Sequence, residues 1–153
     1  PFQYQYPLLR AGLAFAGANV RSEDGSHIGG IVTAEKILNL QLRGTKLVTL
    51  SACETGVGRI EAGEGVVGLR RAFIQAGAKS LVMSMWVVPD EETKELMTNF
   101  YTNFLHNELN KPDALRHAIL QQIQITKKRY GFPHPFYWGA FIFRGDYWYN
   151  GKW

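Results

Sequence analysis

The chain has 153 residues, 46% of them hydrophobic and 20% charged, and its 17 Lys+Arg against 13 Asp+Glu leave a net charge of +4. This composition is typical of a globular domain that can bury a core, so we expect residues 1–153 to form one domain. A lone cysteine excludes an internal disulfide, and we predict a cytoplasmic protein. No apolar run reaches the roughly 20 residues of a membrane helix. The scattered basic residues argue against a nucleic-acid partner.

The first half of the chain alternates short apolar runs with polar segments. An apolar piece at 12–18 precedes the glycine-rich segment 19–30, which predicts a surface loop. Thr33 is placed to cap a short helix over 34–42. The compact β-branched run at 46–50 then has the length and composition of a buried strand.

A helix is expected between two strands in the middle of the chain. The stretch 64–77 has helical spacing and stops at Gly77, a typical C-terminal glycine. It separates the strand at 46–50 from a second apolar strand at 79–86. This order predicts parallel pairing through a right-handed crossover, with helices on both faces of the sheet.

Two longer helices and a last strand complete the expected fold. The segment 87–90 reads as a helix start, with Asp90 as a candidate N-cap. The next helix is expected from about Pro112 to Arg129, ending at Gly131, and 139–145 reads as the last strand. The inward positions expected on these helices are Leu96, Met97, Phe100, Tyr101, Phe104 and Leu105 on the first, and Leu115, Ala118, Ile119 and Ile123 on the second. The fold class is therefore α/β.

The lone cysteine, Cys53, lies just after the predicted strand at 46–50. A single intracellular cysteine is more often a small buried hydrophobe than a nucleophile. Its setting shifts that balance, because ligands gather at the carboxyl ends of parallel strands and Gly56 and Gly58 let the backbone turn closely there. A packed cysteine needs no such glycines.

Several motifs carry a family resemblance. SACETGVG, then GEGVVGLRRAFIQAGAKSLVMSMWVVPDEET, LMTNFY and HPFYWGAFIFRG resemble the CHAT family, caspase-like peptidases often joined to TPR repeats and related to separase. The resemblance extends from about Pro7 to Gly145. It implies a caspase-like three-layer sandwich, in which a mostly parallel sheet is flanked by helices.

The resemblance also implies a mechanism. Cys53 would be the nucleophile, its amide would be one oxyanion donor, and Gly56 would shape the turn, with no metal or cofactor. The base would be a histidine followed by glycine, yet no His-Gly pair precedes Cys53. We therefore expect that this chain begins downstream of the histidine, lacks the first strands of its domain and is nearly inert alone. Expected partners are a protein substrate, the missing N-terminal part of the domain and TPR-type repeats.

Two carboxylates are candidates for substrate binding. Asp90, in MWVVPD, resembles the separase aspartate that holds a positive P1 side chain, and paired hydrogen bonds to a guanidinium would suit it. The alternative is a structural N-cap. Glu54 either lines the substrate pocket or is an exposed loop charge.

The remaining polar and aromatic candidates have simpler interpretations. His27 is followed by Ile28 and reads as a loop residue, and His134 falls at a structural turn before the last strand. The other two histidines, His106 and His117, sit on predicted helices. Trp86 and Trp138 are interpreted as core or pocket wall.

Other function classes fit less well. Residues 63–68 match G-x-G-x-x-G, but a dinucleotide turn must follow its strand directly, and here about a dozen residues intervene. Residues 58–63 fail as a phosphate loop because Glu64, not lysine, follows them. The serious rival to a cysteine endopeptidase is a non-catalytic interaction module of the same fold.

Overall fold

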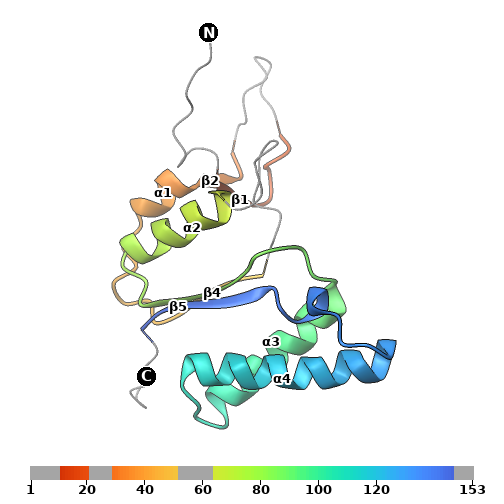
Figure 1. Ribbon diagram of the computed structural model, residues 1–153. Helices are drawn as coiled ribbons and strands as arrows, with labels where there is room; N and C mark the ends of the chain where they lie inside the picture. Colours follow the sequence, from red (N-terminus) through yellow and green to blue (C-terminus); the bar gives the residue numbers. More distant parts are fainter. Residues whose placement is uncertain (1–10, 21–28, 52–63, 147–153) are drawn as a thin grey trace. The chain divides into compact units, whose positions relative to one another are not determined.

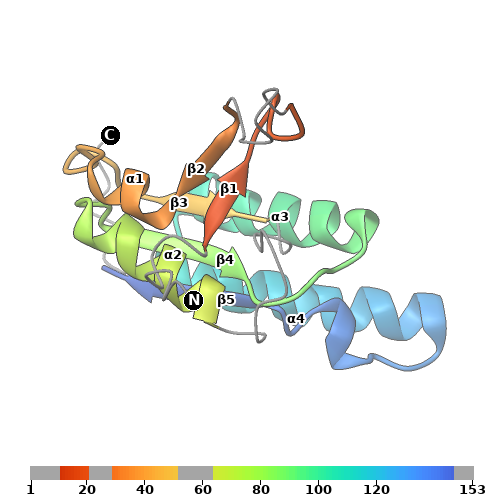
Figure 2. The ribbon, with the colours of Figure 1, turned by 90° about the horizontal axis from the view of Figure 1, so that it is seen from above.

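The computed structural model describes residues 11–20, 29–51 and 64–146. They contain both strands and helices, which confirms the predicted mixed α/β content. The chain divides into two compact units, Pro1–Val48 with Glu54–Lys79 and Thr49–Cys53 with Ser80–Trp153. Figure 1 and Figure 2 show the elements of each unit. That residues 1–153 form one domain stays a prediction.

The first unit opens with a pair of short antiparallel strands. β1 (Gly12–Ala14) pairs with β2 (Ile31–Thr33), with Leu13 opposite Val32. α1 (Ala34–Leu38) follows at once, and the Thr33 side chain accepts a hydrogen bond of 3.3 Å from the Lys36 amide, which confirms the predicted cap. The helix is shorter than the predicted 34–42, since Asn39 is already its C-cap.

The predicted crossover helix is α2 (Glu64–Gln75), which packs beside α1 (Figures 1 and 2). Its buried face carries Leu69, Ala72 and Phe73, whereas Val67 is exposed. Gly77 follows with φ +107°, and a Cβ there would come within 2.9 Å of the Arg43 backbone nitrogen. A glycine is therefore required at this helix end, as predicted.

Three strands form a sheet in the order β3–β4–β5. They are β3 (Val48–Leu50), β4 (Ser80–Ser84) and β5 (Phe141–Gly145), and β5 runs antiparallel to β4 with Phe143 opposite Val82. All five residues of β4 are buried, so both faces of this strand are covered, as a central strand requires. The predicted strands are confirmed; the parallel β3–β4 pairing and the three-layer sandwich stay predictions.

The long helices of the second unit are α3 (Asp90–Leu105) and α4 (Lys111–Tyr130), which lie side by side in Figures 1 and 2. The Asn110 side chain caps α4, and Gly131 ends it in the left-handed conformation. Their buried apolar residues are Leu96, Phe100, Phe104, Ala114, Leu115 and Ala118.

The expected inward stripe of α3 was too wide at one edge. Tyr101 is 37% exposed and Leu105 44% exposed, whereas Phe100 and Phe104 are buried. The buried positions Leu96, Phe100 and Phe104 are spaced four apart along one face of the helix. The residue that follows each buried aromatic therefore lies at the edge of this face. In α4, Ile119 and Ile123 are only partly buried.

None of the helices in the described ranges has both the length and the apolar character that crossing a bilayer would require.

Candidate active site

The predicted nucleophile segment lies between β3 and α2. Cys53, Glu54, Gly56 and also His27 fall outside the described residues. The flanks are described: Ser51 directly follows β3, and α2 begins at Glu64. Cys53 is thus the third residue beyond the last residue of β3 in the sequence.

A hydrogen bond joins β3 to α3. Thr49 Oγ1 and Tyr101 Oη lie 2.8 Å apart. Thr49 precedes Cys53 by four residues. The strand that leads to the predicted nucleophile is therefore attached to α3 by this contact. The Tyr101 side chain is partly exposed because its hydroxyl group makes this polar contact at the edge of the buried face of the helix.

Asp90 is the first residue of α3 and not its N-cap. The N-cap is Pro89, which offers no side-chain hydrogen bond to the helix. The structural alternative considered for Asp90 was therefore wrong by one residue, because Pro89, with φ −54° and ψ 146°, already takes the capping backbone position. Asp90 is exposed, and no ion pair is formed by its carboxylate with any cation of the described ranges.

The segment that leads from β4 to Asp90 is attached to the turn before β5. The Met85 amide donates to the Ala140 carbonyl at 2.9 Å, and Trp86 Nε1 donates to the Phe136 carbonyl at 3.0 Å. Val88 is buried and its carbonyl accepts from Thr93 Oγ1 at 3.4 Å. Two residues before Asp90 the backbone is therefore held at several points.

The two tryptophans that were expected in the core or the pocket wall are each held by a hydrogen bond from the indole nitrogen. Trp86 is 38% exposed, so it is not a core residue, and its ring would meet a Cβ on Gly139 at 3.6 Å. Trp138 donates from Nε1 to the Pro133 carbonyl at 3.1 Å. Both indoles therefore donate hydrogen bonds to the turn that precedes β5.

Two of the three described histidines make contacts at helix ends. His134 Nδ1 accepts a hydrogen bond of 3.2 Å from the Phe136 amide and so caps the short 3-10 helix η2 (Pro135–Tyr137). His106 ends α3, with its amide donating to Thr102, and His117 is exposed on α4. Sequence reasoning had placed His134 at a turn before the last strand and the other two on helices.

A charged cluster between α3 and α4 was missed by sequence reasoning. Arg129 Nη1 lies 2.9 Å from Glu92 Oε1, and its Nη2 lies 2.5 Å from Glu95 Oε1. Tyr130 donates from its hydroxyl to Glu92 Oε1 at 2.6 Å. The Glu92 side chain is only 1% exposed, so a buried carboxylate is satisfied by two donors. Glu92 and Glu95, one turn apart, were the sequence signal.

Opposing effects set the pKa of Glu92. Burial acts to raise the pKa of this carboxyl group, but the hydrogen bonds from Tyr130, its own backbone and Arg129 outweigh burial and leave the pKa below its ordinary value. The same contacts raise the pKa of Arg129, chiefly through the hydrogen bonds to Glu95 and Glu92. Each charged form is thus stabilised by the other.

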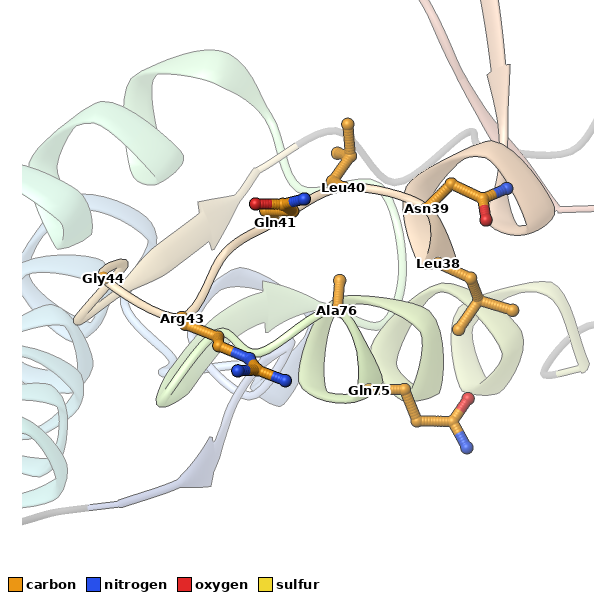
Figure 3. Close-up of a pocket in the computed structure, with 8 residues that line it drawn as sticks. All are labelled: Leu38, Asn39, Leu40, Gln41, Arg43, Gly44, Gln75 and Ala76. Carbon is orange, nitrogen blue, oxygen red and sulfur yellow. The ribbon is translucent and has the colours of Figure 1, made fainter.

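A depression of about 590 Å³ lies in the first unit, and none of the predicted site residues is among those that line it (Figure 3). Arg43 is the one charged residue among the eight that line it, and the ends of α1 and α2 meet there at Leu38 and Gln75. Carbonyl groups at helix C-termini favour a nearby cation, so Arg43 has a structural explanation.

Metal chemistry gains no support in the parts of the chain that the structure describes. No group of three or more His, Cys, Asp and Glu side chains in them could hold a metal ion.

Comparisons with known proteins place the sequence in a family. The CHAT domain model matches residues 2–146. Tetratricopeptide repeat protein 28 of Homo sapiens and that of Mus musculus are each 34% identical over 116 residues, which are 76% of this chain and 4% of the relative's length. The chain thus spans a small part of these relatives. This chain belongs to the CHAT domain family, as its motifs predicted.

Proposed function

We propose that this chain is the C-terminal part of a caspase-like cysteine endopeptidase domain. The observation that carries the proposal is the run SACETG, which directly follows β3 and puts Cys53 three residues beyond the strand in a member of the CHAT family. The proposed nucleophile is Cys53. Its base would be a histidine supplied by the longer protein upstream of Pro1, and this chain alone would be nearly inert.

The proposed reaction is acyl transfer to the cysteine sulfur. The histidine takes the thiol proton, the thiolate of Cys53 attacks the scissile carbonyl carbon, and the oxyanion is held in part by the Cys53 amide. The amine leaves with the proton from the imidazolium, and water then hydrolyses the thioester to release the acid. Gly56 would allow the backbone to turn closely there, and Glu54 would line the substrate pocket.

Asp90 is proposed to read a basic P1 side chain. Its support is an exposed carboxylate at the start of α3, with no ion pair within the described ranges and with the backbone ahead of it hydrogen-bonded to the turn before β5. An exposed carboxylate of this kind is available to a substrate guanidinium, which it can bind through two charge-assisted hydrogen bonds.

The proposed context is a cytoplasmic protein with tetratricopeptide repeats. Its support is the name of the two relatives, in which a region like this chain is a small part of the whole. The repeats would bind a protein substrate or regulator and bring it to the peptidase domain. No cofactor enters the proposal.

One observation favours a second candidate, a non-catalytic interaction module. His27 is the only histidine before Cys53 in the sequence, and Ile28 follows it where the peptidase pattern has glycine. If no His-Gly pair exists upstream of Pro1 in the longer protein, the module is favoured.

The test compares variants of the longer protein that contains this chain. New protein N-termini generated in a cell lysate are labelled and identified by mass spectrometry after adding wild type, Cys53→Ala or His27→Ala. We expect Cys53→Ala to abolish the new termini and His27→Ala to leave them unchanged. Termini that persist with Cys53→Ala would exclude the peptidase function.

A further inference from the structure

The first turn of α3 has no side-chain cap. Its N-cap is Pro89, which has no side-chain acceptor for the free amides of the first turn. The first backbone bond of the helix runs from the Thr93 amide to the Pro89 carbonyl at 3.0 Å. Asp90, at the first helical position, is therefore on a turn that has acidic residues to favour the helix start but no side-chain cap to fix it.

The opposite helix supplies the missing restraint. The guanidinium of Arg129, in the last turn of α4, bridges Glu92 at 2.9 Å and Glu95 at 2.5 Å. Tyr130 adds a hydrogen bond of 2.6 Å to the same Glu92 oxygen. A planar guanidinium fork fixes the direction of its partners as well as their distance. The first and second turns of α3 are thus attached to α4 at two points.

Asp90 lies between two restrained segments and takes part in neither set of contacts. On its N-terminal side, Met85 and Trp86 are hydrogen-bonded to the turn before β5. On its C-terminal side, Glu92 is bound by Arg129 and Tyr130. This arrangement fixes the backbone at Asp90 while leaving its carboxylate exposed.

We propose that Arg129 is a positioning residue: by binding Glu92 it fixes the turn that carries Asp90, and so sets the preference of the site for a basic P1 side chain. This inference rests on the proposed function. Arg129 itself does not touch the substrate. A fixed carboxylate binds a guanidinium without the entropic cost of ordering the turn first.

A purely structural role makes a different prediction. If Arg129 only stabilised the α3–α4 pair, its loss would affect all substrates equally. If it positions Asp90, its loss weakens the binding of a basic P1 group and spares an uncharged one. The comparison of two P1 groups therefore separates the two roles.

The experiment uses the full-length protein and two peptidyl acyloxymethyl ketones that differ only at P1, arginine in one and norleucine in the other. The variants are Arg129→Lys, which keeps the charge but not the fork, and Arg129→Met combined with Glu92→Gln, which leaves no unpaired buried carboxylate. The matched control is Arg116→Met, an exposed arginine of the same helix. Labelling rates at Cys53 and hydrogen exchange of the peptide covering Thr93–Leu96 are measured.

We expect both Arg129 variants to lower the labelling rate with the arginine probe roughly ten- to a hundredfold, because small misplacements have effects of this size. The norleucine rate and the Arg116→Met protein should change by less than about twofold. Exchange over Thr93–Leu96 should rise about tenfold or more in the Arg129 variants only, as local opening becomes easier.

Three results would overturn the inference in distinct ways. Unchanged exchange would show that Arg129 does not hold the turn. Faster exchange with equal losses for both probes would leave a structural role only. If wild type is labelled by neither probe at Cys53 while exchange responds as expected, the proposed function fails and the recognition role fails with it, although the restraint itself stands.

Discussion

Thr49 in β3, four residues before the predicted nucleophile, and Tyr101 in the C-terminal half of α3 share a hydrogen bond of 2.8 Å. Since Tyr101 is partly exposed, the bond should contribute modestly. We expect Tyr101→Phe to lower the free energy of unfolding by about 1 kcal/mol or less, measured by urea denaturation of the longer protein.

The matched control is Tyr137→Phe, which removes a hydroxyl for which no hydrogen bond is found within the described ranges. It should leave the urea midpoint unchanged. Equal effects of the two substitutions would contradict a specific role for the Thr49–Tyr101 contact.

Asp90→Asn tests the proposed recognition of P1. The amide keeps the size of the side chain but loses the charge, and hydrogen bonds to charged groups contribute about 1.5–3 kcal/mol. We expect kcat/KM for a peptide with arginine at P1 to fall roughly 10- to 100-fold, with little change for an uncharged P1. Glu108→Gln, an exposed carboxylate beyond the other end of α3, should have no effect. A similar loss for both peptides would refute the assignment of Asp90 to P1.

Glu92 should make the stability of the protein sensitive to acid. Burial raises its pKa, but the bonds from Tyr130 and Arg129 more than reverse this effect, so the folded-state pKa is below the unfolded value of 4.5. Such a group contributes stability above the unfolded pKa and loses it as pH falls through the folded pKa. Wild type should therefore exceed Glu92→Gln in stability at pH 7, and the difference should shrink below about pH 4.5.

Urea midpoints at pH 7, 5 and 3.5 measure this dependence. Glu91→Gln is the control, because the Glu91 side chain is 71% exposed and its oxygen lies 3.6 Å from Arg129. Its difference from wild type should be small at every pH. A Glu92→Gln difference that does not change with pH would mean that this carboxyl is not stabilised in its charged form.

Trp86→Phe tests how the segment ahead of Asp90 is held. The substitution keeps a large ring and removes the donor to the Phe136 carbonyl at 3.0 Å, which should cost about 1 kcal/mol of stability. Trp138→Phe removes an equivalent bond to the Pro133 carbonyl. Both should lower the thermal midpoint, but only Trp86→Phe should weaken preference for a basic P1. Loss of that preference in both variants would point to a general loosening of the turn.

Local signals were enough to predict most elements of the fold. The cap at Thr33 and the glycines at 77 and 131 act within one turn of the residues they affect, and the structure confirms all three. The helix start near Asp90 was predicted, but the cap lies one residue earlier than predicted, because Pro89, with its φ fixed by the ring, takes the capping backbone position.

The contacts between elements could not be predicted in the same way. Arg129 lies 37 residues from Glu92 in the sequence, and no local pattern indicates which charges meet across two helices. In the candidate site, the resemblance to the CHAT family identified Cys53, Glu54 and Gly56, and they remain predictions. The exposure of Asp90 could be established only with the helix in place.

The most direct test of the account is whether Cys53 forms an acyl-enzyme. The longer protein is mixed with a peptide p-nitrophenyl ester bearing arginine at P1, quenched in acid within the first turnover and mapped by mass spectrometry. The account predicts an acyl group on the peptide that contains Cys53, absent from Cys53→Ala. An acyl group on another residue, or none while the ester is consumed, would contradict it.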